Sequence, residues 1–123
     1  MTKILIVDDE TELRELLSIY LKMKGFDVVE AISGKAALII LNQNKDISLI
    51  ISDIQMPNGD GMFLLHALKN ELKSTIPIFM YTGGSSKELS FYKQMGASAV
   101  FEKPMNLKNL VLIIHDFLEL KTA

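Results

Sequence analysis

Residues 4–9 read Ile4-Leu5-Ile6-Val7-Asp8-Asp9, four apolar residues followed at once by two carboxylates. A short and continuous apolar run of this kind is typical of a parallel strand that is buried on both faces. The two aspartates would then stand at the carboxyl end of that strand. In open α/β sheets this edge is where ligands bind. These six residues therefore predict a fold class and the position of a site within it.

Three later apolar runs also end in a polar residue, and these residues are Asp53, Thr82 and Lys103. Because the carboxyl ends of parallel strands meet at one edge, we expect the three side chains to lie near Asp8 and Asp9. Carboxylate oxygens are ligands that Mg²⁺ prefers, and several of them close together repel one another unless a cation or proton intervenes. An aspartate can attack phosphorus, while a metal and a lysine stabilise the transferring group. The pattern indicates a site for Mg²⁺ and a phosphoryl group.

Helical segments separate these runs. The predicted strands are Lys3–Asp8, Asp27–Ala31, Ser48–Asp53, a fourth strand that begins after Pro77, and Ala99–Glu102. The predicted helices are Glu12–Lys24, a helix capped by Ser33, Met62–Lys73, Lys87–Met95 and Leu107–Leu120. Strands that alternate with helices imply parallel pairing and right-handed crossovers, so that helices cover both faces of the sheet. The predicted fold class is a doubly wound α/β domain with a five-stranded parallel sheet.

The composition is that of an ordinary compact domain, with 123 residues of which 49% are hydrophobic and 23% charged. A formal net charge of −2 argues against a nucleic-acid-binding module, which usually presents a basic face. The lack of cysteine excludes disulfides, thiolate metal sites and a cysteine nucleophile. The chain shows neither signal-peptide features nor an apolar stretch of the ~20 residues that span a bilayer. We therefore expect a cytoplasmic protein that binds neither nucleic acid nor membrane directly.

Taken together, the motifs resemble those of response-regulator receiver domains, the phospho-accepting half of bacterial two-component signalling. The resemblance covers essentially the whole chain. It rests on Asp8-Asp9, on Asp53 within the segment Ser52–Gly61, on Thr82-Gly83, and on Gly96-Ala97 leading to Lys103-Pro104. The family implies a flavodoxin-like fold with five helices, in which the strands, numbered along the chain, lie in the order 2-1-3-4-5. It also implies one receiver domain over residues 1–123 with no output domain present.

The resemblance further implies a role for each site residue. Asp53 would accept a phosphoryl group from a sensor histidine kinase or a phosphotransfer protein. Asp8, Asp9 and Asp53 would hold Mg²⁺ together with the backbone carbonyl of Gln55. The protein would assist its own phosphorylation and dephosphorylation without being an enzyme that acts on an independent substrate. Phosphorylation would switch the binding of a downstream partner or output domain that the sequence does not identify.

Two further residues are expected to contact the phosphoryl group. By the same resemblance, Thr82 would bond a phosphoryl oxygen, and Lys103 would pair with the phosphate and precede a cis peptide bond to Pro104. The positions expected to influence how long the phosphate survives are Gln55 and Gly84.

Val100 departs from the family pattern. Receiver domains usually have Tyr or Phe three residues before the lysine, whereas this chain has Val100 there and Phe101 one place later. Because side chains alternate faces along a strand, Phe101 should lie on the opposite face as a core residue. We expect the phosphorylation chemistry to be retained and the usual output switch to differ. The glycine-rich loop of residues 83–86 would then carry more of the conformational change.

The residues leave other functions open. A phosphohydrolase with an aspartate nucleophile would carry a second aspartate two residues later as general acid, where this chain has Gln55. A flavodoxin-like cofactor carrier would need a hydroxyl- and glycine-rich phosphate loop in place of Asp8 and Asp9. A phosphorylation-independent interaction domain would keep every site residue while Val100 disables the response. Asp8 and Asp9, taken alone, would also suit the start of the next helix.

Overall fold

The structure is a computed structural model that describes residues 2–83 and 86–122, without the side chains of residues 86, 87 and 120–122. Gly84 and Ser85, part of the loop expected to carry conformational change, lie outside the described residues. In the described part of the chain, no helix is long and apolar enough to cross a membrane.

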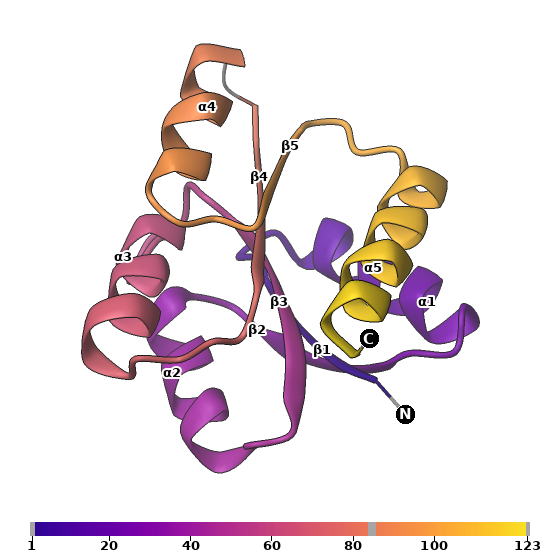
Figure 1. Cartoon of the computed structure of the whole chain (residues 1–123), viewed down its shortest axis with the longest axis horizontal. Helices are drawn as coiled ribbons and strands as arrows, with labels where there is room; N and C mark the ends of the chain where they lie inside the picture. Colours follow the sequence, from indigo (N-terminus) through magenta and orange to yellow (C-terminus); the bar gives the residue numbers. More distant parts are fainter. Residues whose placement is uncertain (1, 84–85, 123) are drawn as a thin grey trace.

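Strands and helices alternate along the described chain (Figure 1). The strands are β1 (Lys3–Val7), β2 (Asp27–Ala31), β3 (Ile47–Asp53), β4 (Ile78–Thr82) and β5 (Ala99–Glu102). The helices are α1 (Thr11–Met23), α2 (Gly34–Gln43), α3 (Gly61–His66), α4 (Ser86–Gln94) and α5 (Leu107–Thr122). Every predicted strand and helix is present, and all except the third helix differ from the prediction by no more than two residues at their ends.

The third predicted helix is interrupted. After α3 the chain continues as a π-helical segment, η1 (Ala67–Glu71), in which the N–H of Leu72 donates to the carbonyl of Ala67 at 2.9 Å. Lys73 then takes a positive φ of 48°. Apolar spacing predicted one continuous helix because a single wider turn leaves the buried positions Leu65 and Leu68 on the same side of the segment.

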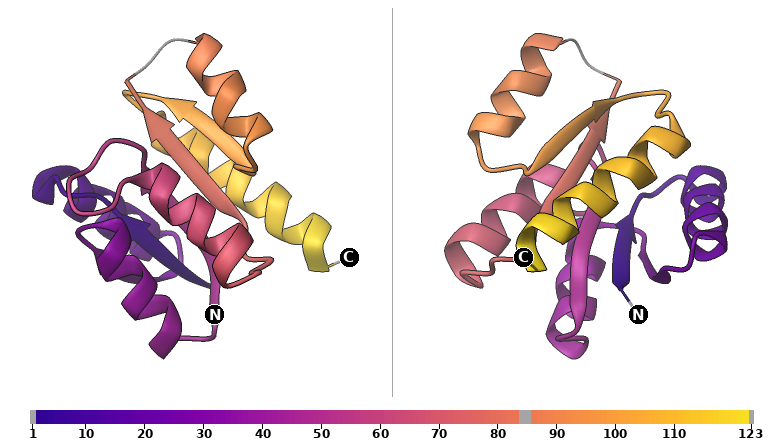
Figure 2. Two further views of the ribbon diagram at one scale, coloured as in Figure 1. Left: turned by 90° about the vertical axis from the view of Figure 1, so that its left-hand side faces the viewer. Right: turned by 45° about the vertical axis from the view of Figure 1, so that its right-hand side comes forward.

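The five strands form one parallel sheet in the order β2-β1-β3-β4-β5, which confirms the flavodoxin-like order. Helices α2, α3 and α4 cover one face, and α1 and α5 cover the other (Figure 1). Figure 2 shows the same layers from two further directions, with α5 lying along the sheet. The strand order reverses at β1 and β3, and ligands of such sheets generally bind beyond the carboxyl ends of the strands at this point. Asp8 and Asp53 stand at this point of the fold.

Alternate side chains of the central strands enter two separate cores. Leu5 and Ile50 belong to the core beneath α2 and α3, whereas Ile4 and Ile51 belong to the core beneath α1 and α5. Burial of each such side chain contributes about 1.5–3 kcal/mol to stability. Because both faces of the central strands are packed, the polar residues at the strand ends are carried on a rigid support.

The edge strand β5 confirms the predicted alternation of Val100 and Phe101. Val100 packs against the core beneath α2 and α3, and Phe101 packs against the other core with its ring centroid 5.7 Å from that of Phe79. Phe101 remains half-buried, because β5 lies at the edge of the sheet and has a strand on one side only. The aromatic ring is therefore on the α1/α5 side, away from the family's usual switch position.

Side chains and one glycine define where two helices begin. Ser33 caps α2, as predicted, by accepting a hydrogen bond from the N–H of Ala36 at 3.1 Å. At the start of α3, the N–H of Gly61 donates to the carbonyl of Ile54 at 2.8 Å. A Cβ on Gly61 would lie 2.7 Å from the carbonyl oxygen of Asp53 and 2.8 Å from the Cα of Ile54. The missing side chain thus allows α3 to pack directly on the end of β3.

We expect Gly61→Ala to lower the free energy of unfolding by about 2 kcal/mol, because the added methyl group meets backbone atoms that must shift. Urea unfolding followed by circular dichroism measures the change. Gly83→Ala is the matched control, since a Cβ at Gly83 meets nothing within 4 Å. Its effect should stay within about 0.5 kcal/mol. Equal effects of the two substitutions would contradict the close packing inferred at Gly61.

Candidate functional site

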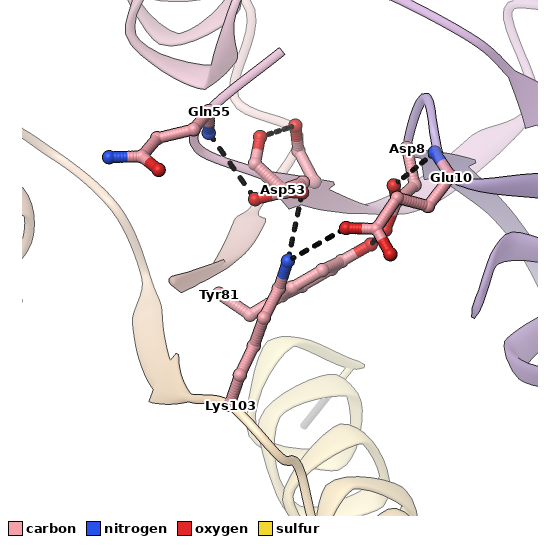
Figure 3. Close-up of polar contacts among 7 residues, drawn as sticks. Asp8, Glu10, Asp53, Gln55, Tyr81 and Lys103 are labelled. Carbon is pink, nitrogen blue, oxygen red and sulfur yellow. Dashed lines mark hydrogen bonds and ion pairs between the residues drawn. The ribbon is translucent and has the colours of Figure 1, made fainter. Parts of the chain in front are cut away.

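Residues from the ends of β1, β3, β4 and the segment after β5 meet at the carboxyl edge of the sheet (Figure 3). Register explains the meeting, because Val7 pairs with Ser52 and Asp53 pairs with Tyr81. Asp8 therefore follows β1 beside the end of β3. The polar residues that the sequence separates by dozens of positions are brought to one edge by parallel pairing.

Asp53 lies at the centre of this group and is only 3% exposed. Its Oδ2 accepts a hydrogen bond from Nζ of Lys103 at 3.0 Å, and its Oδ1 accepts one from the backbone N–H of Gln55 at 3.3 Å. Lys103 also lies 3.7 Å from Oε1 of Glu10. The peptide bond between Lys103 and Pro104 is cis, as predicted. The lysine thus reaches the buried carboxylate across the edge of the sheet.

Asp8 is fully buried and is held by donors at both carboxylate oxygens. The backbone N–H of Glu10 donates to Oδ1 at 2.8 Å, and the hydroxyl of Tyr81 donates to Oδ2 at 2.5 Å. Its backbone carbonyl accepts a hydrogen bond from Nη1 of Arg14 at 2.9 Å, and Arg14 in turn pairs with Glu30 at 2.9 Å. These contacts hold the loop after β1 in place.

Three carboxylates gather at the edge. Asp8, Glu10 and Asp53 each offer a carboxylate oxygen, and these oxygens lie within 4.8 Å of one another. An all-oxygen set of this charge fits Mg²⁺, which prefers such ligands and retains several waters. Asp9, which was expected among the metal ligands, has an exposed side chain outside this group. The structure therefore brings Asp8 and Asp53 together and adds Glu10.

Thr82 lies at the end of β4, as its place after an apolar run predicted, and it is buried there. Its backbone carbonyl accepts a hydrogen bond from the backbone N–H of Lys103 at 2.9 Å. This bond fixes the start of the segment after β5 beside the end of β4. Thr82 and Lys103 are consequently neighbours at the site.

Sequence reasoning missed Glu10 and Tyr81. Glu10 continues the acidic run of Asp8 and Asp9, so its charge was a visible signal, but its position just before a helix suited a capping role equally well. Tyr81 lies inside an apolar strand and gave no signal beyond its hydroxyl. Which carboxylate this hydroxyl meets depends on the register of β1, β3 and β4.

Burial and charge act against each other on the titratable groups. Burial raises the pKa of Asp53, and the nearby charge of Asp8 adds to this effect, while the hydrogen bond from Lys103 opposes it. Burial tends to lower the pKa of Lys103. The hydrogen bond to Asp53 and the negative charge of Asp53 outweigh this effect, so the pKa of the lysine is raised. Burial and the bond to Asp8 raise the pKa of Tyr81 far above its ordinary value. Lys103 therefore stays cationic and Tyr81 stays a neutral donor.

Comparison with known proteins gives consistent matches. The family model described as response regulator receiver domain matches residues 4–115. The transcriptional regulatory protein CpxR of Escherichia coli (strain K12) is 37% identical over 119 residues, which cover 96% of this chain and 50% of CpxR. The response regulator SaeR of Staphylococcus aureus (strain USA300) is 32% identical over 119 residues, covering 96% and 51%. The chain thus spans about half the length of these curated relatives.

Solved structures agree with the sheet order and helix placement. The chemotaxis protein CheY4 of Vibrio cholerae superposes with a TM-score of 0.84 and 30% identity, covering 94% of this chain and 98% of CheY4. A response regulator receiver domain protein from Clostridium thermocellum gives a TM-score of 0.90 and 26% identity, covering 99% and 98%. In both cases the match extends over nearly the whole of each chain.

The raised pKa of Asp53 predicts a definite pH dependence. The ionised carboxylate is less favourable in the folded than in the unfolded protein. Its cost to stability is therefore absent below the pKa of Asp53 in the unfolded protein, and it develops as pH rises through the higher pKa in the folded protein. In metal-free buffer, Asp53→Asn should therefore raise the free energy of unfolding near pH 7. This gain should shrink as pH falls to about 4. Urea unfolding across this range measures it.

Asp46→Asn provides the control with the opposite sign. The hydrogen bond from Lys3 lowers the pKa of Asp46, so its stabilisation is present above the unfolded pKa and is lost as pH falls. This substitution should lower the unfolding free energy slightly near pH 7, because the pair is exposed to water. A loss of stability for Asp53→Asn near pH 7 would contradict the burial cost assigned to that carboxylate.

Proposed function

The chain belongs to the response regulator receiver domain family, and on this basis we propose that Asp53 accepts a phosphoryl group from a sensor histidine kinase or a phosphotransfer protein. The observation that supports this most directly is a nearly buried carboxylate paired with Lys103 at 3.0 Å and lying beside Asp8. Receiver domains act in two-component phosphorelay signalling and are not classical enzymes. In this proposal the domain assists its own phosphorylation and dephosphorylation and has no independent substrate.

Each site residue has a part in the proposed reaction. One oxygen of Asp53 attacks phosphorus, a new O–P bond forms, and the bond between phosphorus and the donor's leaving group breaks. Lys103 exchanges its contact with Asp53 for one with the phosphoryl oxygens, and the hydroxyl of Thr82 donates to another of them. Lysine and hydroxyl together offset the charge that the new group brings.

Asp8, Asp9, Asp53 and the backbone carbonyl of Gln55 are the proposed Mg²⁺ ligands. When bound, the ion screens the repulsion between the carboxylates and the phosphoryl oxygens. Asp8 and Asp53 already lie with their oxygens close together, which supports their part in this set. Asp9 is included because it matches the family motif, directly after Asp8.

Phosphorylation replaces the singly charged carboxylate of Asp53 by a phosphoryl group with a charge of about −2 at the buried edge of the sheet. In the proposed switch this charge shifts a pre-existing equilibrium of the segments around Thr82 and Lys103. Val100 has no ring to rotate, so the switch differs from that of relatives with an aromatic residue at this position.

Response regulators interact with histidine kinases and with output domains. For this chain we propose a downstream protein or output domain as the partner and a cytoplasmic location. We propose no direct contact of residues 1–123 with nucleic acid, in keeping with their net charge of −2. The curated relatives are about twice as long as this chain. The proposal of an output domain as partner therefore concerns a longer protein, whereas phosphorylation of Asp53 concerns this domain.

The central test is intact mass after incubation with Mg²⁺ and a small acyl-phosphate donor. We expect one phosphoryl group per chain, because Asp53 is the buried carboxylate that Lys103 contacts, whereas both oxygens of Asp8 are held by other donors. Asp53→Asn should remain unmodified, and removal of Mg²⁺ should abolish the gain in mass. An unmodified wild-type chain, under conditions that phosphorylate a control receiver, would instead favour the phosphorylation-independent interaction domain.

A second test separates Asp9 from Glu10 as a metal ligand. The side chain of Glu10 is 62% exposed and lies near Lys103, so its carboxylate already has solvent and a counter-ion. We expect Asp9→Asn to weaken Mg²⁺ binding at least about tenfold and Glu10→Gln to weaken it far less. Isothermal titration calorimetry with Mg²⁺ measures both dissociation constants. The reverse order would assign the ligand role to Glu10.

A further inference from the structure

Tyr81 is a fully buried tyrosine whose polar end reaches the candidate metal site (Figure 3). Its hydroxyl donates to Oδ2 of Asp8 at 2.5 Å, across 73 positions of sequence. Nζ of Lys103 lies 5.4 Å from the centroid of its ring, within the range of a cation–π interaction. One side chain thus contacts both the acidic and the basic part of the site.

Packing of the ring in the core does not explain why this position carries a hydroxyl group. The rest of Tyr81 fills the core beneath α1 and α5, a role that Phe would serve equally well. A buried phenol without a partner is unfavourable, so the hydroxyl requires an acceptor at this position. That acceptor is Asp8, whose other oxygen is held by the N–H of Glu10.

The two donors leave Asp8 able to bind a cation. Each carboxylate oxygen has two lone pairs, and each oxygen of Asp8 uses one of them for the contact described. A metal ion or its water ligand can therefore be accepted without displacing Tyr81. The bonds fix the direction in which the remaining lone pairs point, as outer contacts of metal ligands generally do.

We propose that Tyr81 is a positioning residue of the Mg²⁺ site, whose hydroxyl holds the Asp8 carboxylate in the orientation that receives the ion. The inference rests on the proposed function, because it takes Asp8 to be a metal ligand. It adds a residue from the interior of β4 to a site otherwise built from strand ends and loops.

Tyr81→Phe isolates the hydroxyl, because the ring and its contact with Lys103 are retained. We expect the dissociation constant for Mg²⁺, measured by isothermal titration calorimetry, to rise about tenfold. Tyr20→Phe is the control, since Tyr20, which is half-buried, also has a lysine, Lys24, 5.4 Å from its ring centroid. Its dissociation constant should equal that of the wild type.

A purely structural role for Tyr81 would give a different result. Tyr81→Phe would then lower the melting temperature without Mg²⁺ while leaving the dissociation constant unchanged. An unchanged dissociation constant overturns the inference. A lower dissociation constant also overturns it, because it would mean that the hydroxyl competes with the ion for Asp8.

A measurement on the wild-type protein does not depend on the folding of any variant. The hydroxyl proton of Tyr81 should give a slowly exchanging, downfield proton resonance, which selective labelling assigns. Its persistence at saturating Mg²⁺ supports positioning, and its loss would overturn the inference. If the wild-type chain binds no Mg²⁺, both this inference and the proposed metal site fail. Normal wild-type binding with an unaffected Tyr81→Phe variant would overturn the inference alone.

Discussion

The repulsion between carboxylates held out of water at the edge of an apolar sheet is the constraint on which this site depends. Asp8 and Asp53 are both buried, and their oxygens lie close together. The surrounding groups each offset part of the resulting cost: Lys103 pairs with Asp53, and Tyr81 donates to Asp8. Backbone N–H groups complete the contacts. These contacts offset only part of the repulsion between the carboxylates, so the site still favours a cation.

The sheet makes this arrangement possible because its central strands are packed on both faces. Strand ends in such a sheet move little, so side chains at the ends of β1, β3 and β4 keep their relative positions. Gly61 allows α3 to approach the backbone of Asp53 and Ile54 closely at the end of β3. The packing that stabilises the fold therefore also fixes the positions of the side chains at the site.

Three aromatic rings, those of Phe79, Phe101 and Phe117, pack in the core on the face opposite to the usual switch position of the family. The ring of Phe101 lies near that of Phe79, and the ring of Phe79 packs edge-on against Phe117 of α5 at 5.5 Å. Val100 occupies the other face with a small side chain. A one-residue displacement along β5 therefore moved the aromatic group to the other layer, as the pleat of a strand requires.

The sequence by itself determined the alternation of strands and helices and the convergence of Asp8, Asp53, Thr82 and Lys103, because apolar runs mark buried strands and parallel strands end at one edge. Only the tertiary structure decided that Glu10 joins the carboxylates, that Tyr81 donates to Asp8, and that η1 interrupts the third helix. These features depend on side-chain direction, local backbone hydrogen bonding and register between distant strands. Local periodicity carries no information about any of the three.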